Sequence, residues 1–139
     1  MAQYTNCGLV GVDPNNYSKL VHEMIAGYEY EVFNMRESKM RDYILHKNYL
    51  GMNIASPYKH IAFALCDDLT EDARATGCVN ALRLCDDGRI LGTNTELPGF
   101  LQMVAREQIE IAGKHVMILG SGSIPTGVVF TRISAGCSK

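Results

Sequence analysis

Apolar and polar positions along the chain change repeatedly from the spacing of a strand to the spacing of a helix. The apolar run Tyr4–Val12 predicts a strand that ends at Gly11. Apolar residues then recur at helical spacing over Ser18–Ala26, and Gly27 is placed to end this helix. Residues 28–32 alternate apolar side chains with glutamates, which predicts a half-buried strand.

The same alternation of strands and helices continues through the middle of the chain. The predicted elements are a helix over residues 38–48, a strand over 50–55, a helix over 57–66 and a short helix over 70–75. One face of the first helix carries Met40, Tyr43, Ile44 and Lys47. Pro57 suits the first position of the second helix, and Thr70 suits the N-cap of the third. This order of elements favours a sheet covered by helices.

Two further strands are predicted on either side of a strong turn signal. Residues 79–84 and 89–93 have the composition of strands, and Asp86-Asp87-Gly88 lies between them. Glycine accepts the positive φ that a tight hairpin turn requires. A hairpin adds antiparallel pairing to a sheet whose other strands are joined through helices. The sequence therefore predicts an α/β fold with a mixed, mainly parallel sheet flanked by helices.

The last third of the chain opens with the clearest helical pattern, over Glu96–Ile109. Its apolar stripe consists of Leu97, Phe100, Leu101, Val104 and Ile109. The apolar run over residues 115–119 then predicts a strand that is buried on both faces. Residues 124–139 contain several β-branched side chains, which are weak helix formers.

Composition narrows the class of protein. The 139 residues are 47% hydrophobic with a net charge of −2, enough apolar surface for one core. No basic run indicates nucleic acid, and no apolar segment has the length that crosses a membrane. Five scattered cysteines without a CxxC pair favour reduced thiols in a cytoplasmic protein and give no metal site. The start of the chain lacks the pattern of a secretory signal.

Polar side chains occur in three predicted loops at strand ends. The loops carry Asn53 with Lys59, then Asn80, then Glu96. Open α/β folds bind ligands at the carboxyl ends of strands, in the loops that lead into the following helices. A lysine and a carboxylate from different loops can serve as a proton-transfer pair, and amides can satisfy the hydroxyls of a small ligand. The alternatives are a helix cap for Asn53, a solvated surface position for Lys59 and a helix-start carboxylate for Glu96.

A glycine-rich turn, Gly120-Ser121-Gly122-Ser123, follows the last predicted strand. Glycines at this place let a backbone approach the pyrophosphate of a dinucleotide at a helix N-terminus. Pro125 and the weak helix formers after it argue against the motif. The residue that reads the ribose would lie about 20 positions further on, at or beyond Lys139.

The order of these motifs resembles the shikimate dehydrogenase family. That family carries N-V-T-x-P-x-K, G-A-V-N-T, N-T-D-x-x-G-F and a G-x-G-G turn in this order. The corresponding segments here are Asn53-Ile54-Ala55-Ser56-Pro57-Tyr58-Lys59, Gly77-Cys78-Val79-Asn80-Ala81, Asn94-Thr95-Glu96-Leu97-Pro98-Gly99-Phe100 and Gly120-Ser121-Gly122-Ser123. Ser18-Lys19-Leu20-Val21-His22 resembles the serine-rich loop of the family. The resemblance covers residues 4–123.

The resemblance implies a role for each matched residue. Lys59 takes the place of the catalytic lysine, and Glu96 takes the place of the catalytic aspartate. The positions that bind the substrate, shikimate or 3-dehydroshikimate, correspond to Asn16, Ser18, Asn53 and Asn80. The cofactor, NADP, would contact Gly120, Ser121, Gly122 and Ser123. The implied reaction is the NADPH-dependent reduction of 3-dehydroshikimate to shikimate in aromatic amino-acid biosynthesis, with no nucleic acid or membrane as partner.

Several departures from the family pattern change this expectation. Ala55 replaces a threonine that bonds the substrate, Asn16 replaces a serine, and Glu96 is longer than aspartate by one methylene. The family is roughly twice as long, so we expect a substrate-binding domain over residues 1–95. Residues 96–139 would then form a linking helix and the start of an incomplete Rossmann unit. The unpaired strand Val116–Leu119 would favour self-association. A non-catalytic hydroxy-acid binding module and a degenerate remnant are the alternatives to an enzyme.

Overall fold

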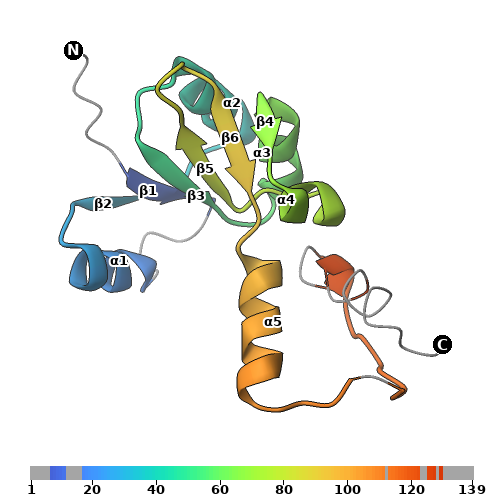
Figure 1. The fold of residues 1–139 in the computed structure, drawn as a ribbon. Helices are drawn as coiled ribbons and strands as arrows, with labels where there is room; N and C mark the ends of the chain where they lie inside the picture. The colour runs from blue at the N-terminus through green and yellow to red at the C-terminus, as the bar shows by residue number, and fades with distance from the viewer. Residues whose placement is uncertain (1–6, 12–16, 112, 123–124, 128, 130–139) are drawn as a thin grey trace.

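The computed structural model describes residues 7–11, 17–111, 113–122, 125–127 and 129. Its centre is one six-stranded sheet with the strand order β2-β1-β3-β5-β6-β4. The strands are β1 (Cys7–Val10), β2 (Tyr30–Phe33), β3 (Gly51–Ile54), β4 (Asp68–Leu69), β5 (Ala81–Leu84) and β6 (Ile90–Thr93). Figure 1 shows the sheet running from β2 at one side to β4 at the other.

The strand pairing is mixed, as the sequence predicts. Strand β1 pairs in parallel with both β2 and β3, and β4 pairs in parallel with β6. Strand β5 is antiparallel to both of its neighbours, β3 and β6. The carboxyl ends of β1 and β3 therefore meet the beginning of β5 at one edge of the sheet, which is where parallel sheets collect functional side chains.

The helices are α1 (Ser18–Ala26), α2 (Glu37–His46), α3 (Lys59–Leu65), α4 (Glu71–Thr76) and α5 (Glu96–Arg106). The main core lies where α2 and α3 pack on the sheet, and its members include Val10, Met40, Ile44, Ile54 and Ala62. Each of these side chains is 2% exposed or less. Helix α5 leaves the sheet and projects away from it (Figure 1).

Local signals in the sequence end and begin these elements as predicted. Gly27 closes α1 in the left-handed region at φ 66°. The Thr70 hydroxyl accepts a hydrogen bond from Ala73 N and caps α4. The turn between β5 and β6 places Gly88 at φ 79°, and Gly88 N donates to Cys85 O. The predicted hairpin is thus confirmed.

Some predicted boundaries were wrong. Helix α3 begins at Lys59, because Pro57 lies in the turn before it, after a cis Ser56–Pro57 bond. Lys47 lies beyond α2 with φ 54° and does not continue the helical face. Strand β4 has only two residues and was missed, since a period of two cannot be recognised in so short a segment.

The predicted buried strand at residues 115–119 was also wrong. Residues 114–120 form no strand, and Met117 and Leu119 are 81% and 83% exposed. An apolar run becomes a strand only where a neighbouring strand pairs with it, and the described residues offer this run no neighbour. The predicted helix over Glu96–Ile109 ends earlier, at Arg106, and only Leu97 of its apolar stripe is buried; Leu101 in α5 and Ile109 beyond its end are exposed.

Candidate functional site

A cavity of about 370 Å³ opens at the edge of the sheet where β1 and β3 end and β5 begins. Among the side chains that line it are five predicted site residues, Ser18, Asn53, Lys59, Asn80 and Glu96. They come from α1, β3, α3, the residue just before β5, and α5. The structure therefore brings together residues that are up to 78 positions apart in the chain (96 − 18).

Lys59 and Glu96 form an ion pair between Nζ and Oε1 at the side of this cavity. Their side chains are only 13% and 23% exposed, so water screens the pair less than a surface ion pair. Each is the first residue of its helix. A carboxylate at a helix N-terminus is stabilised by the helix dipole, whereas an ammonium there is not. Glu96 therefore offsets the unfavourable position of Lys59.

The backbone around Lys59 is tied to the sheet. Val79 N donates to Lys59 O over 3.1 Å, and Ala55 N donates to Val10 O over 2.9 Å. The hydroxyl of Tyr58 donates to Met35 O over 2.9 Å. These bonds hold the turn before α3 from both sides, so the lysine is presented from a fixed base.

Glu96 is positioned through Asn94, which is buried with 1% exposure. Asn94 Oδ1 accepts from Glu96 N at 2.9 Å and from Leu97 N at 3.3 Å, which satisfies two amides at the start of α5. Asn94 Nδ2 donates to Thr76 Oγ1 at 2.9 Å and to Cys78 O at 3.4 Å. One carboxamide thus fastens the start of α5 to α4 and to the segment between α4 and β5.

Asn80 holds the same helix start from the cavity side. Its Oδ1 accepts from Thr95 N at 2.9 Å, and its Nδ2 donates to Thr95 Oγ1 at 2.9 Å. A carboxamide has two N–H donors, so one of them remains for a ligand. Asn80 can both brace α5 and contact a molecule in the cavity.

Asn53 has a partner that the sequence did not reveal. The Tyr30 hydroxyl donates to Asn53 Oδ1 over 2.7 Å, and the ring of His22 stacks on the ring of Tyr30 with centroids 4.1 Å apart. Tyr30 and His22 both line the cavity. The alternating pattern of residues 28–32 indicated a strand, but β1 lies between Tyr30 and Asn53, and no spacing in the sequence predicts that contact. His22 belongs to the loop that resembles the family, but neither His22 nor Tyr30 was predicted to line the site.

The remaining predicted site residues lie elsewhere. Asn16 and Ser123 fall outside the described residues. Gly120, Ser121 and Gly122 do not line the cavity. Gly120 has φ 129°, and Gly122 O accepts from the backbone and hydroxyl of Thr126 in a helical segment at residues 125–127. A glycine turn before a helix is present, but the strand that should lead into a dinucleotide cradle is not. The described residues here do not fit NADP as a complete site.

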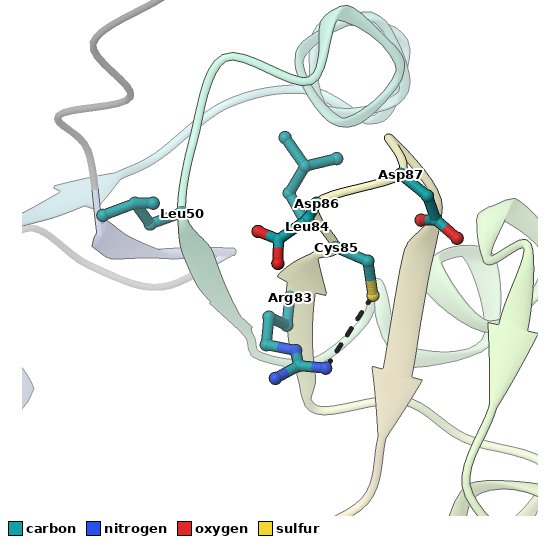
Figure 2. A pocket seen from close by; sticks show the side chains of 6 residues that line it. All are labelled: Leu50, Arg83, Leu84, Cys85, Asp86 and Asp87. Atoms are coloured by element: carbon teal, nitrogen blue, oxygen red, sulfur yellow. Dashed lines mark hydrogen bonds between the residues drawn. The ribbon is translucent and has the colours of Figure 1, made fainter.

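A second hollow, of about 530 Å³, lies at the opposite end of β5 (Figure 2). Arg83, Asp86 and Asp87 line it together with Leu50, Leu84 and Cys85, and it contains none of the predicted site residues. The Asp87 carboxylate is engaged by Arg89 at 2.8 Å, which holds the pKa of Asp87 below its usual value. We therefore assign the site to the first cavity.

The described residues show neither a metal cluster nor a membrane-spanning helix. No group of three or more His, Cys, Asp or Glu side chains in this part of the chain could hold a metal ion. Every helix that the structure describes is too short or too polar to cross a bilayer.

Residues 12–82, half of the chain, match the family model of the shikimate dehydrogenase substrate binding domain. The chain belongs to this family. A relative from Carboxydothermus hydrogenoformans, "Shikimate dehydrogenase (NADP(+))", is 36% identical over 89 residues, which are 64% of this chain and 31% of that protein.

Solved shikimate dehydrogenases share the fold of the family member described here. Shikimate dehydrogenase 1 from Peptoclostridium difficile has a TM-score of 0.83 at 26% identity, over 96% of this chain and 52% of that one. A chorismate mutase/shikimate 5-dehydrogenase fusion from Clostridium acetobutylicum gives the same four values. The Thermus thermophilus enzyme, solved in complex with NADP(H) and shikimate, has a TM-score of 0.79 at 26% identity over 95% of this chain and 53% of that one. The chain spans about half the length of these structures and about a third of the curated relative.

Proposed function

We propose that this chain binds shikimate or 3-dehydroshikimate in the 370 Å³ cavity and provides the proton-transfer groups of a shikimate dehydrogenase. The observation that carries the proposal is the Lys59–Glu96 ion pair beside the amides of Asn53 and Asn80 in one cavity. A cyclic hydroxy acid offers hydroxyls and a carboxylate, which are partners for amides and for an ammonium. The Thermus thermophilus relative was solved with shikimate bound, which supports this class of ligand.

Lys59 is the group that would move the proton. Its ammonium Nζ donates a proton to the ketone oxygen of 3-dehydroshikimate, and Glu96 Oε1 holds the ammonium in place. Ser18, Asn53 and Asn80 orient the ring through its hydroxyls and carboxylate. NADPH, the cofactor implied by the family, would supply hydride to the ketone carbon. Because the described residues do not form its complete cradle, the function proposed for them is binding and proton transfer.

The proposal assigns different roles to residues 1–95 and residues 96–139. Residues 1–95 carry the sheet and all of the described cavity residues except Glu96. Residues 96–139 begin with α5, which we propose as the link to a cofactor-binding part. In this arrangement Glu96 lies at the junction of the two parts.

Calorimetric titration of the chain with shikimate, without cofactor, tests the proposal. We expect saturable binding that is lost in Lys59→Ala and retained in the control Lys39→Ala, a lysine on α2 away from the cavity. Absence of binding to the wild-type chain at millimolar shikimate would refute the proposal. Restoration of dehydroshikimate reduction on addition of a separate cofactor-binding domain would extend it to catalysis.

A binding module without catalysis is the second candidate. The observation that favours it is the lack of a strand over residues 114–120, next to the glycine turn. Shikimate binding by wild type, together with unchanged binding in Glu96→Gln and no turnover with any added cofactor domain, would select this candidate.

A further inference from the structure

Tyr30 is a buried tyrosine whose hydroxyl points at a ligand-contacting amide. It lies on β2, is 1% exposed, and donates to Asn53 Oδ1 at 2.7 Å. His22 stacks on its ring at 4.1 Å with an interplanar angle of 3°. The ring is therefore held between a helix and the sheet, and the hydroxyl has a fixed direction.

The bond to Tyr30 determines which end of the Asn53 carboxamide faces the cavity. Burial raises the pKa of Tyr30 above its ordinary value, so the hydroxyl keeps its proton across the physiological range. A buried O–H needs an acceptor, and the acceptor that the described residues provide is Asn53 Oδ1. With the oxygen occupied on this side, Nδ2 is the end left for a ligand.

We propose that Tyr30 is a positioning residue that presents the Asn53 NH2 group to the cavity, so that this point of the site selects acceptor oxygens of the ligand. The inference rests on the proposed function for the identity of the ligand, a hydroxy acid. It goes beyond that proposal because it assigns a polarity to one contact and a role to a residue outside the recognised motifs. A ligand carbonyl, carboxylate or hydroxyl oxygen fits this point, whereas a ligand group that can only donate does not.

The first test needs no ligand. The side-chain amide of Asn53 is observed in a ¹⁵N–¹H spectrum and assigned by its loss in Asn53→Ala. We expect a rigid amide in the wild-type chain, and in Tyr30→Phe an amide as mobile as that of exposed Asn48. The control is Tyr28→Phe, which removes a hydroxyl 3.2 Å from His22 Nδ1 but none that contacts Asn53. An unchanged Asn53 amide in Tyr30→Phe would overturn the positioning role.

The second test measures shikimate affinity by calorimetry in the full chain. We expect Tyr30→Phe to weaken binding about five- to tenfold, the effect of one misoriented hydrogen bond, and Tyr28→Phe to leave it unchanged. Tyr30→Phe should have no further effect in an Asn53→Ala background, because its action passes through Asn53. Additive losses would overturn the inference.

Asn53→Asp tests the polarity directly. Aspartate can still accept from Tyr30, but it presents an acceptor to the cavity in place of a donor. We expect Asn53→Asp to bind shikimate at least as weakly as Asn53→Ala, and wild-type affinity in Asn53→Asp would overturn the assigned polarity. If the wild-type chain does not bind shikimate at all, the proposed function fails, while the ligand-free amide measurement still decides the role of Tyr30.

Discussion

Replacing Asn94 by alanine should destabilise the chain far more than the same change at Asn80. Both carboxamides brace the start of α5, but Asn94 is buried with three of its four bonds, the fourth being partly buried, whereas the bonds of Asn80 are exposed to water. Water can replace the lost partner at Asn80, whereas the groups around Asn94 would remain unsatisfied. Comparing Asn94→Ala with Asn80→Ala therefore measures how much more a buried hydrogen bond than an exposed one stabilises the start of α5.

The magnitude follows from the bonds that Asn94 makes. Loss of the acceptor for Glu96 N and Leu97 N removes a helix cap, worth about 1 kcal/mol. Loss of the donor to Thr76 Oγ1 and Cys78 O adds about 1–2 kcal/mol, since both acceptors are buried. We expect Asn94→Ala to lower the free energy of unfolding by about 2–3 kcal/mol and Asn80→Ala by less than about 1 kcal/mol.

Urea unfolding followed by circular dichroism measures both values, with the slope m checked to be equal for the variants. Asn94→Asp is an informative third variant, because it keeps the acceptor for the two helix amides and loses the donor to Thr76. It should fall between wild type and Asn94→Ala. A loss in Asn94→Ala no larger than that in Asn80→Ala would refute the reasoning that buried bonds hold α5.

Three further predictions concern packing, pH and association. Gly92→Ala should destabilise the chain by about 1–3 kcal/mol, because the added Cβ would clash with Cys66 Sγ and lie 2.7 Å from Val79 Cγ2. Gly99→Ala in α5 is the matched control: its added Cβ would have no atom within 4 Å, so the better helix propensity of alanine should raise the midpoint of thermal unfolding. Burial raises the pKa of the Cys66 thiol from 9.0 to about 11, and the nearby Asp67 carboxylate adds to this shift. The folded state therefore holds the thiol proton more tightly than the unfolded state. The stability that this proton contributes is present below pH 9 and is lost as the pH rises through 11. If the urea midpoint of Cys66→Ala falls as steeply between pH 9 and 11 as that of the wild-type chain, Cys66 is not the source of the pH dependence. We also expect the exposed pair Met117 and Leu119 to promote self-association, so Met117→Lys/Leu119→Lys should sediment as a smaller species at high concentration, whereas Leu45→Lys should not. Equal sedimentation of all three chains would count against this surface.

Local signals predicted most of the fold because the physics that sets these elements is local. The helix at Ser18–Ala26 has the predicted ends, the Thr70 cap forms, and the turn at Gly88 joins two antiparallel strands. The apolar run at residues 115–119 failed for the opposite reason. Whether such a run forms a strand depends on a neighbouring strand, which its own sequence does not specify.

The candidate site also has a part that the sequence predicted and a part that it did not. Motif order selected five of the residues that line the cavity, including Lys59 and Glu96, but missed Tyr30 and His22. It did not predict that Tyr30 contacts Asn53 across β1, because a tertiary contact between side chains of non-adjacent strands leaves no periodic signal. Nor did it predict that Asn94 would be fully engaged in capping α5.

The fastening of α5 at one end gives the helix the mechanics of a lever. Asn80 and Asn94 hold the backbone at residues 95–97, and the rest of α5 extends from the sheet for about 15 Å. A tilt of α5 by about 10° would move Arg106 by nearly 3 Å on this length, yet Glu96, at the fulcrum, would hardly move. The far end of α5 can therefore move while the carboxylate keeps its place beside Lys59.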